Sequence, residues 1–310
     1  MHLTLPPRIN ANGLLPFLTD LGRPVNTSTV TVDFTHLRRV SPAALAALAC
    51  QVARWRAERR TVIFHGLDEC PITGYLQRMD VLTVCGIEMS ELFTRHDGKG
   101  RFVPVQRVEQ PVEQKGDAMA SCVAPDGDGY GHPLSDLYDF VWYVMTETAN
   151  NVRQHSGGVG FMTAQVTQAG GFVKLAVADN GRGIRQSFID AGLPWAVGLD
   201  DVAAIRRALE PKISSKGSPS NEGVGLTLSA GLARLAKAWM LIVSGRGVIQ
   251  MLPDGRQVAA ELPSPGFYQG TLVALSFKQT EISDFPQLLT AAKIRAGLLP
   301  STGVRGTFET

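Results

Sequence analysis

The sequence has few cysteines, few aromatic residues and little surplus charge. Its 310 residues include four cysteines and 7% aromatic residues, and the net charge is +2 at pH 7. A net charge this close to zero creates no strong field for DNA or for an anionic membrane, so nucleic acid is not an expected partner. The cysteines are scattered, with no C-x-x-C pair and no spacing typical of metal ligands.

Long apolar runs are also absent from the sequence. No stretch approaches the roughly 18 apolar residues that a membrane span needs. The first residues, MHLTLPPRIN, lack the basic region and following apolar stretch of a signal peptide. We therefore expect a cytoplasmic protein with no membrane partner.

A G-x-x-x-x-G-K-[ST] sequence is missing too, which excludes a P-loop nucleotide site.

The length and apolar content of the chain are sufficient for two domains. Hydrophobic residues make up 44% of the 310 residues, and single cores usually stop growing at around 250 residues. Between residues 95 and 132 the chain is rich in Gly, Pro and charge, as is typical of a linker, although RFVPVQRV could pair as an edge strand. We predict a first domain over residues 1–100, a linker over 101–132, a second domain over 133–280 and a C-terminal extension over 281–310.

The first half of the chain alternates between strand and helix patterns. Residues 30–34 and 61–67 read as strands because β-branched residues alternate with polar ones. Ser41 followed by Pro42 opens an Ala- and Leu-rich run, which is a good helix start. Cys50 lies within this run and is expected to be a small core residue. Short connections between these elements indicate a small α/β layer.

This order of segments resembles the STAS domain of anti-anti-sigma factors. The resemblance rests on VDFTHLRRVSPAALAAL, RRTVIFHGL and ITGYLQRMDVL. In that family an Asp-Ser-Ser-Gly-Leu turn opens the helix. Here Ser41 stands at the Asp position, where it can act as a helix cap, and Pro42 or Ala43 replaces the phosphorylatable serine. The resemblance implies a STAS-like module that has lost its switch and serves as a docking surface for a protein partner.

The second half begins with a predicted helix over residues 134–155. At about 100° per residue, Glu147, Asn151 and His155 lie on one face, at or within an apolar stripe. Burying a carboxylate and an amide there without partners is costly, so a polar group must lie against this face. That group is either a ligand or the other half of an interhelical hydrogen-bond pair. We expect His155 to have a packing or capping role.

A predicted strand over residues 172–179 ends in a carboxylate. Side chains alternate along a strand, so Asp179 enters the same core side of the sheet as Val177. The Asn-Gly-Arg-Gly run at 180–183 then breaks the strand with residues that allow a ligand to approach the backbone. Arg182 in this run either contacts a phosphate or is exposed.

Two further segments carry glycine at the start of an element. Gly223 and Gly225 precede an apolar helix, whose free N–H groups and positive dipole end suit a phosphate. Lys212 and Lys216 lie in the preceding loop, where either could reach a phosphate or remain solvated. An alternating strand over residues 270–277 begins with Gly-Thr.

These four segments, in this order, resemble the GHKL, or Bergerat, ATP-binding fold. The pattern is E-x-x-x-N on a helix, D-x-G-x-G after a strand, G-x-G-L before a helix and G-T on the last strand. The family includes gyrase, the large heat-shock chaperones, MutL, histidine kinases and anti-sigma serine kinases. ETANNVRQHSGG is most similar to the anti-sigma kinases. The resemblance implies an α/β sandwich with helices on one face of a mixed sheet, and ATP and Mg²⁺ as cofactors.

The resemblance also implies a role for each matching residue. Glu147 would be the general base and Asn151 would coordinate Mg²⁺. Asp179 would accept a hydrogen bond from the adenine amino group, supported by Thr271. The other positions implied are Gly181 and Gly183 beside the base, Gly223, Gly225 and Leu226 near the phosphates, and Lys216 in the lid.

The sequence is compatible with three functions. An ATPase switch is favoured by the long segment between Asp179 and Gly223, which contains a predicted helix, DDVAAIRRAL. A serine/threonine kinase of the anti-sigma type is favoured by the fused STAS-like domain, because such kinases act on STAS partners. A docking module that binds ATP without turnover is the third. A histidine kinase is not expected, since no helical hairpin carries an acceptor His, and a homodimer is one option because such modules often dimerise.

Overall fold

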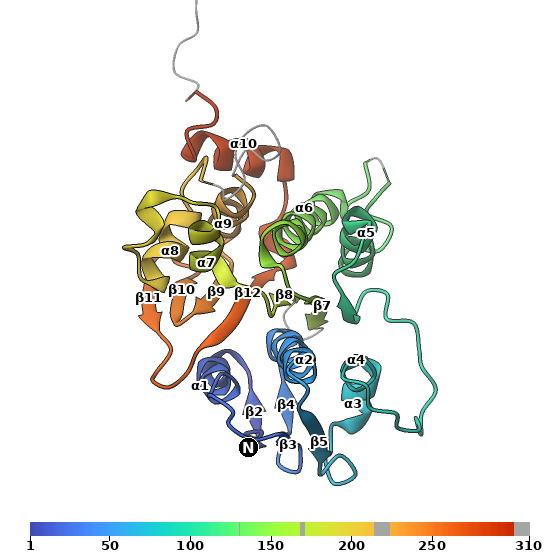
Figure 1. Ribbon diagram of the computed structural model, residues 1–310. Helices are drawn as coiled ribbons and strands as arrows, with labels where there is room; N and C mark the ends of the chain where they lie inside the picture. Colours follow the sequence, from blue (N-terminus) through green and yellow to red (C-terminus); the bar gives the residue numbers. More distant parts are fainter. Residues whose placement is uncertain (130, 168–170, 214–223, 301–310) are drawn as a thin grey trace, which may run out of the picture.

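The two halves of the chain stack as layers around a large central sheet (Figure 1). A computed structural model describes residues 1–129, 131–167, 171–213 and 224–300. A small parallel sheet is followed by the N-terminal helices, then the large sheet, and then the helices of the C-terminal half. Both parallel and antiparallel sheets are present, so the predicted α/β class is confirmed.

The N-terminal unit contains a three-stranded parallel sheet in the order β1-β3-β5. The strands are β1 (His2–Thr4), β3 (Thr29–Asp33) and β5 (Thr61–His65). A second parallel pair joins β2 (Arg8–Ile9) to β4 (Arg39–Val40). The strands predicted at 30–34 and 61–67 are therefore confirmed.

Four helices complete this unit. They are α1 (Ala11–Leu21), α2 (Pro42–Ala57), α3 (Thr73–Arg78) and α4 (Val81–Val84). Helix α2 begins as predicted, because Ser41 Oγ accepts a hydrogen bond from the Ala44 N–H at 3.4 Å and Pro42 occupies the first helical position.

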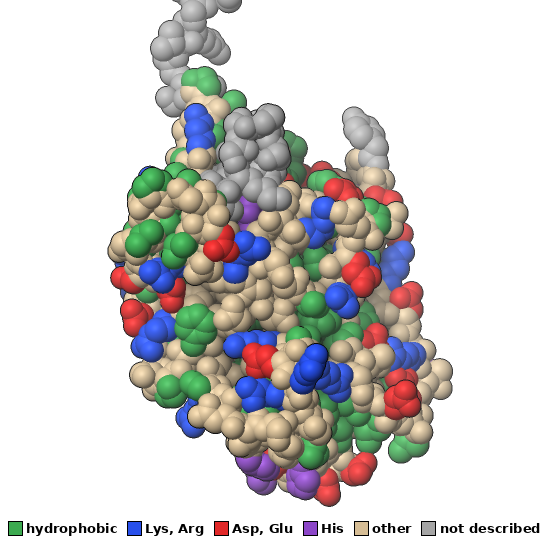
Figure 2. All heavy atoms as spheres, in the orientation of Figure 1, with side chains coloured by type: hydrophobic (Ala, Val, Ile, Leu, Met, Phe, Trp, Pro, Cys, Tyr) green, Lys and Arg blue, Asp and Glu red, His purple; other side chains and the backbone are tan. Residues whose placement is uncertain are grey.

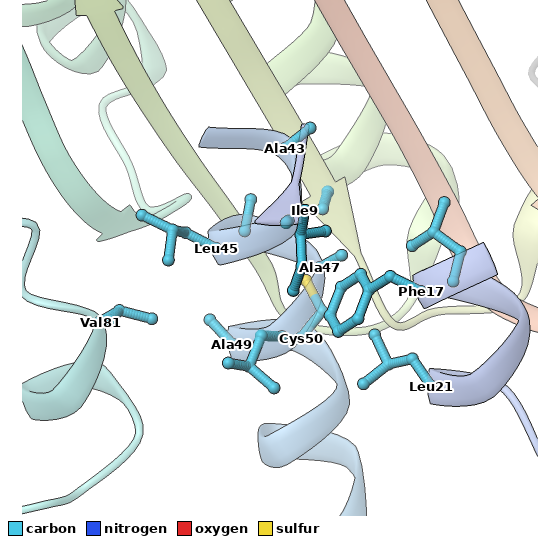
Figure 3. Close-up of a cluster of buried hydrophobic side chains, with 14 of the residues drawn as sticks. Ile9, Phe17, Leu21, Ala43, Leu45, Ala47, Ala49, Cys50 and Val81 are labelled. Carbon is cyan, nitrogen blue, oxygen red and sulfur yellow. The ribbon is translucent and has the colours of Figure 1, made fainter. Parts of the chain in front are cut away.

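Helix α2 is buried on nearly all sides between the two sheets. Every residue from Pro42 to Val52 is buried, and the helix packs against strands of the large sheet. Its many alanines allow this close approach. Figure 3 shows Phe17 and Leu21 of α1 beside Cys50 of α2, with Val81 of α4 on the other side of α2. Along this helix the surface of the N-terminal unit is therefore covered by the chain itself.

The central sheet has seven strands among the described residues, in the order β11-β10-β9-β12-β8-β7-β6. Each neighbouring pair is antiparallel. The strands are β6 (Phe102–Arg107), β7 (Gly160–Thr167), β8 (Phe172–Asp179), β9 (Trp239–Gly245), β10 (Gly247–Met251), β11 (Gln257–Glu261) and β12 (Tyr268–Lys278).

The helices of the C-terminal half cover the other face of this sheet. They are α5 (Val112–Val123), α6 (Ser135–Asn151), α9 (Gly225–Leu235) and α10 (Phe285–Arg295). The segment between β8 and α9 adds α7 (Gly183–Asp190), a 3₁₀ turn (Pro194–Ala196) and α8 (Asp201–Ala208). A second 3₁₀ turn (Gln279–Glu281) precedes α10. The helices predicted from DDVAAIRRAL and after the glycines are confirmed.

Strand β8 shows how the two cores are separated. Leu175 and Val177 face the C-terminal core, whereas Ala176 and Ala178 face the N-terminal core. Because both faces are covered, the strand is a nearly continuous apolar run. In the C-terminal core, Phe140 of α6 meets Phe277 of β12 with ring centroids 5.0 Å apart.

One prediction about the sheet is wrong. The sheet was expected to be mixed, but its described strands are all antiparallel, because consecutive strands pair through hairpins or return beside an earlier strand. The helices of the C-terminal half lie on one face, as expected, and α1 and α2 of the N-terminal unit cover the second face. The small side chains of the N-terminal face, Ala176 and Ala178, are what allow α2 to lie there.

The segment predicted as a linker, residues 101–132, is instead part of the fold. It contains β6, which pairs with β7 as the edge strand that RFVPVQRV allowed, and α5, which packs against α6. Glycine, proline and charged residues are concentrated in the turns on either side of these elements. The average composition of the segment therefore does not reveal its short apolar patterns, which include Val103, Val105, Met119 and Val123. Helix α10, within the predicted C-terminal extension, packs against α6 and α9.

The distribution of charge on the surface agrees with the small net charge of the sequence. On the face shown in Figure 2, basic and acidic side chains are interspersed. None of the helices in the described part of the chain is long and apolar enough to cross a membrane.

Leu45→Ala tests whether the packing of α2 between the two sheets stabilises the folded chain. Leu45 is fully buried between the layers, so its truncation should lower the free energy of unfolding by about 2–5 kcal/mol. Urea denaturation measures this change. Leu92→Ala, at a side chain that is 97% exposed, is the control and should change stability by less than about 0.5 kcal/mol. Equal stability of the two variants would contradict the packing of α2.

Candidate functional site

A cavity of ≈ 340 Å³ lies at the end of α6, against the C-terminal face of the central sheet. Its lining comes from segments far apart in the sequence: the end of α6 and the following turn, the end of β8 with α7, the end of α8, the start of α9, and β12. Seven predicted site residues line it, namely Glu147, Asn151, Asp179, Gly183, Gly225, Leu226 and Thr271. Lys216 and Gly223 lie outside the described residues.

Asp179 is the most constrained polar group of the cavity. It ends β8, is only 3% exposed, and faces the same side as Val177, as the alternation predicts. Its Oδ1 accepts hydrogen bonds from Ser156 Oγ and from the Gly181 N–H, both at 2.8 Å. Its Oδ2 accepts one from the Thr271 N–H at 3.2 Å. Burial raises the pKa of Asp179 to about 6, although the three hydrogen bonds act in the opposite direction.

Gly181 does not line the cavity but lies directly behind Asp179. A Cβ atom at this position would collide with the carbonyl oxygen and the hydroxyl of Ser156. Glycine is therefore required at this position, because the loop must approach Ser156 closely. This approach allows the Gly181 N–H to reach Asp179.

The other polar residues of the cavity come from the last turns of α6. Glu147 and Asn151 are half-buried and lie one turn apart. The Glu147 carboxylate lies against Gly225, where a Cβ atom would collide with Oε2. Burial raises the pKa of Glu147. The structure thus places a carboxylate of elevated basicity beside the N-terminus of α9.

Helix α6 continues into a π-helical turn, Val152–Ser156, which the sequence did not predict. Gly157 follows this turn as its cap, with a φ of +68°. The turn directs Gln154, His155 and Ser156 along the cavity wall. Short π-helical turns are frequent at functional sites because they redirect side chains within a helix.

Two serines that the sequence did not single out organise the site. Ser156 donates to Asp179, as described above. Ser244, at the end of β9, donates to the Gly270 carbonyl at 2.9 Å and accepts from the Ile184 N–H at 2.9 Å. The Thr271 hydroxyl also donates to Ser244, at 3.4 Å. The only sequence signal for Ser244 is a polar residue after the apolar run MLIV.

The outer side of the loop at 180–183 is held by the rest of the chain. Arg182 forms an ion pair with Asp190 at 2.7 Å, and its backbone N–H donates to the Ser156 carbonyl at 2.9 Å. Asn180 Nδ2 donates to the main-chain carbonyl of Cys50 in α2 at 3.1 Å, and its Oδ1 accepts from the Val159 N–H at 2.8 Å. Arg182 is therefore an anchor of the loop, and Asn180 joins the loop to the N-terminal unit.

A metal ion in this cavity would depend on atoms from a ligand. Within the described ranges, no group of three or more His, Cys, Asp or Glu side chains has an arrangement that could hold a metal. The Asn151 amide oxygen is a suitable hard ligand for Mg²⁺, which usually takes one or two protein ligands together with water and phosphate oxygens. The residues present therefore fit a cation that arrives with a phosphate group.

A scan of the chain against models of protein families gives no match, and a search of curated proteins finds no similar protein. The family resemblance of the sequence therefore stays a prediction.

Asp179→Asn tests whether Asp179 is buried at a cost to stability. Its folded-state pKa of about 6 lies above the ordinary value of 3.8, so the folded protein holds a proton that the unfolded chain releases. Stability is therefore greater below about pH 4 and decreases as the pH rises through about 6. The free energy of unfolding of wild type minus that of Asp179→Asn should decrease by on the order of 3 kcal/mol across this window.

Urea denaturation of both proteins between about pH 4 and pH 7 measures this difference. A difference that stays constant with pH would mean that Asp179 is not held in a buried, proton-binding environment. Asp128→Asn, at an exposed carboxylate, is the matched control.

Proposed function

We propose that this protein binds ATP with Mg²⁺ in the cavity at the end of α6 and hydrolyses it as a nucleotide-dependent switch that regulates a partner protein. The observation that carries the proposal is the convergence of Glu147, Asn151, Asp179, Gly225 and Thr271 on one cavity from four separate segments. A cavity lined by apolar walls with a few convergent polar groups is typical of small-molecule sites.

The part of the cavity around Asp179 suits a purine base. Val177, Ile184, Phe188 and Val273 supply apolar walls. Asp179 is an acceptor whose Oδ2 has, among the described residues, one hydrogen bond, from the Thr271 N–H. A carboxylate oxygen has room for a second donor, so this atom is suited to the exocyclic amino group of adenine.

The part of the cavity around α9 suits phosphates. Gly225 and Leu226 begin a helix of 11 residues, and the N–H groups of its first turn have no partners within the helix. These N–H groups and the positive end of the helix dipole favour an anion. Asn151, one turn beyond Glu147, would hold the Mg²⁺ ion, which supplies charge neutralisation to the phosphates when it is bound.

Glu147 is suited to the role of general base. Burial raises its pKa, which makes the carboxylate a better proton acceptor near neutral pH. Its contact with Gly225 keeps it beside the start of α9. There it would accept a proton from a water molecule positioned for attack on the terminal phosphate.

A serine/threonine protein kinase is the second candidate. The same Glu147 carboxylate would then accept the proton of a partner hydroxyl. The outer face of the β1-β3-β5 sheet favours this reading, because it remains accessible to a partner, with Ile63 48% exposed. The substrate would be another chain, since Pro42 and Ala43 replace the serine of the STAS pattern.

Asp179→Asn should weaken ATP binding. An amide has one acceptor oxygen where the carboxylate has two, and its NH₂ group cannot accept a hydrogen bond from the adenine amino group. We expect an increase in Kd of about 10- to 100-fold at pH 7.5, the value of one hydrogen bond to a charged group. Isothermal titration with a non-hydrolysable ATP analogue and Mg²⁺ measures it. Asp128→Asn is the control, and wild-type affinity in Asp179→Asn would exclude the adenine role.

Glu147→Ala should keep nucleotide binding and lose turnover by about 10²- to 10⁴-fold, the usual contribution of a general base. The assay uses γ-labelled ATP with Mg²⁺ and follows free phosphate and protein-bound label together, with and without a lysate of the source cell. Glu113→Gln, at an exposed carboxylate of α5, is the control.

The outcomes separate the candidates. Phosphate release that is lost in Glu147→Ala supports the ATPase. Label on a lysate protein, lost in the same variant, supports the kinase. Bound ATP with neither signal supports a docking module, and unchanged turnover in Glu147→Ala excludes the general-base role.

A further inference from the structure

Ser156 makes several hydrogen bonds around Asp179, although no sequence pattern singled it out. It is the last residue of the π-helical turn and is 5% exposed. Its hydroxyl donates to Asp179 Oδ1 at 2.8 Å and accepts from the Gly158 N–H at 3.0 Å. Its carbonyl oxygen accepts from the Arg182 N–H at 2.9 Å. Ser156 therefore joins the end of α6 to both ends of the loop that follows β8.

These contacts make the two oxygens of Asp179 unequal. Oδ1 accepts from two donors, Ser156 and the Gly181 N–H, whereas Oδ2 accepts only from the Thr271 N–H among the described residues. All three donors require an acceptor at Asp179, so they favour the ionised carboxylate. Oδ2 is then the atom with remaining acceptor capacity toward a ligand.

We propose that Ser156 is a positioning residue that determines base specificity: its hydroxyl holds Asp179 as an ionised acceptor, so that Oδ2 selects adenine over guanine. This inference rests on the proposed function, nucleotide binding in the same cavity, and goes beyond it by naming the residue that sets the selectivity.

The selectivity follows from the hydrogen-bonding groups of the two purines. Adenine presents an amino group, a donor, at the position where guanine presents the O6 acceptor. An ionised carboxylate only accepts, so with both bases held in the same orientation it binds the adenine amino group and repels guanine O6. A protonated carboxyl group has an O–H donor, which would bind O6 and reduce the preference. The protonation state of Asp179 therefore controls which base the site prefers.

Several other titratable groups lie around Asp179. Cys50 of α2 and Tyr268 of β12 lie near it, and burial raises the pKa of both side chains, so both stay neutral near pH 7. Glu147 of α6 and His155 of the π-helical turn line the same cavity. Arg182, the nearest cationic residue in sequence, is paired with Asp190.

The test compares ATP and GTP binding to wild type, Ser156→Ala and Ser156→Thr over a range of about pH 5 to 8.5, by isothermal titration with non-hydrolysable analogues. Loss of a hydrogen bond to the ionised form raises the pKa of Asp179. The pH midpoint below which the ATP preference is lost should therefore rise by about one pH unit or more in Ser156→Ala. Near pH 6.5 this corresponds to a loss of ATP preference of up to about 10-fold. Ser156→Thr, which keeps the hydroxyl, should retain the wild-type midpoint.

Thr163→Val is the matched control, because Thr163 is a fully buried hydroxyl that donates to the Val103 carbonyl at 2.7 Å, in a part of the sheet that does not line the cavity. Its removal should alter stability without moving the midpoint. Ser156→Cys provides a second variant if the alanine variant does not fold. Its weaker donor should give a midpoint between those of wild type and Ser156→Ala.

A purely structural role for Ser156 would lower stability, or lower affinity equally at every pH, and would leave the midpoint unchanged. That result overturns the role of Ser156 while the proposed function stands. Failure of wild type to bind either nucleotide at any pH overturns both.

Discussion

The rest of the site depends on one physical constraint, the burial of the Asp179 carboxylate at the end of a core strand. A buried carboxylate needs hydrogen-bond donors, and here they come from three elements: Ser156 of the π-helical turn, the Gly181 N–H of the loop and the Thr271 N–H of β12. Each donor fixes the position of its own element relative to β8. The polar network therefore specifies the shape of the cavity as well as its chemistry, and a charged group kept in such a place at a cost to stability is typical of a functional site.

The second constraint is that the central sheet is covered on both faces. The cavity lies on one face and α2 lies on the other, and Asn180 joins them through its hydrogen bond to the Cys50 carbonyl. The N-terminal unit is therefore part of the same packed structure as the cavity. A partner protein cannot use the buried surface of α2 without separating the layers, and it must instead approach an exposed surface such as the outer face of the β1-β3-β5 sheet.

The sequence predicts those site residues whose side chains lie on regular elements. Alternation in β8 predicts the direction of Asp179, and helical spacing in α6 predicts that Glu147 and Asn151 share a face. Ser156 could not be found in this way, because a π-helical turn changes the periodicity at the point where it begins. The arrangement of strands and the position of α2 could not be found either. They depend on pairing between distant segments, and average composition conceals short elements such as β6.

Among the described residues two carboxylates line the cavity, Glu147 and Asp179, and their surroundings differ. At Asp179 three donors oppose the effect of burial, so the group is held in place as an acceptor, which is what recognition of a fixed donor on a ligand requires. At Glu147 burial raises the pKa, and no hydrogen-bond donor in the described part of the chain offsets this effect. A proton acceptor in the proposed reaction needs oxygen atoms that donors do not already occupy, whereas a group that recognises a fixed donor needs to be held in one position. In the proposed function, the separation of the two roles follows from where the donors lie: recognition belongs to the end of β8 and proton transfer to the end of α6.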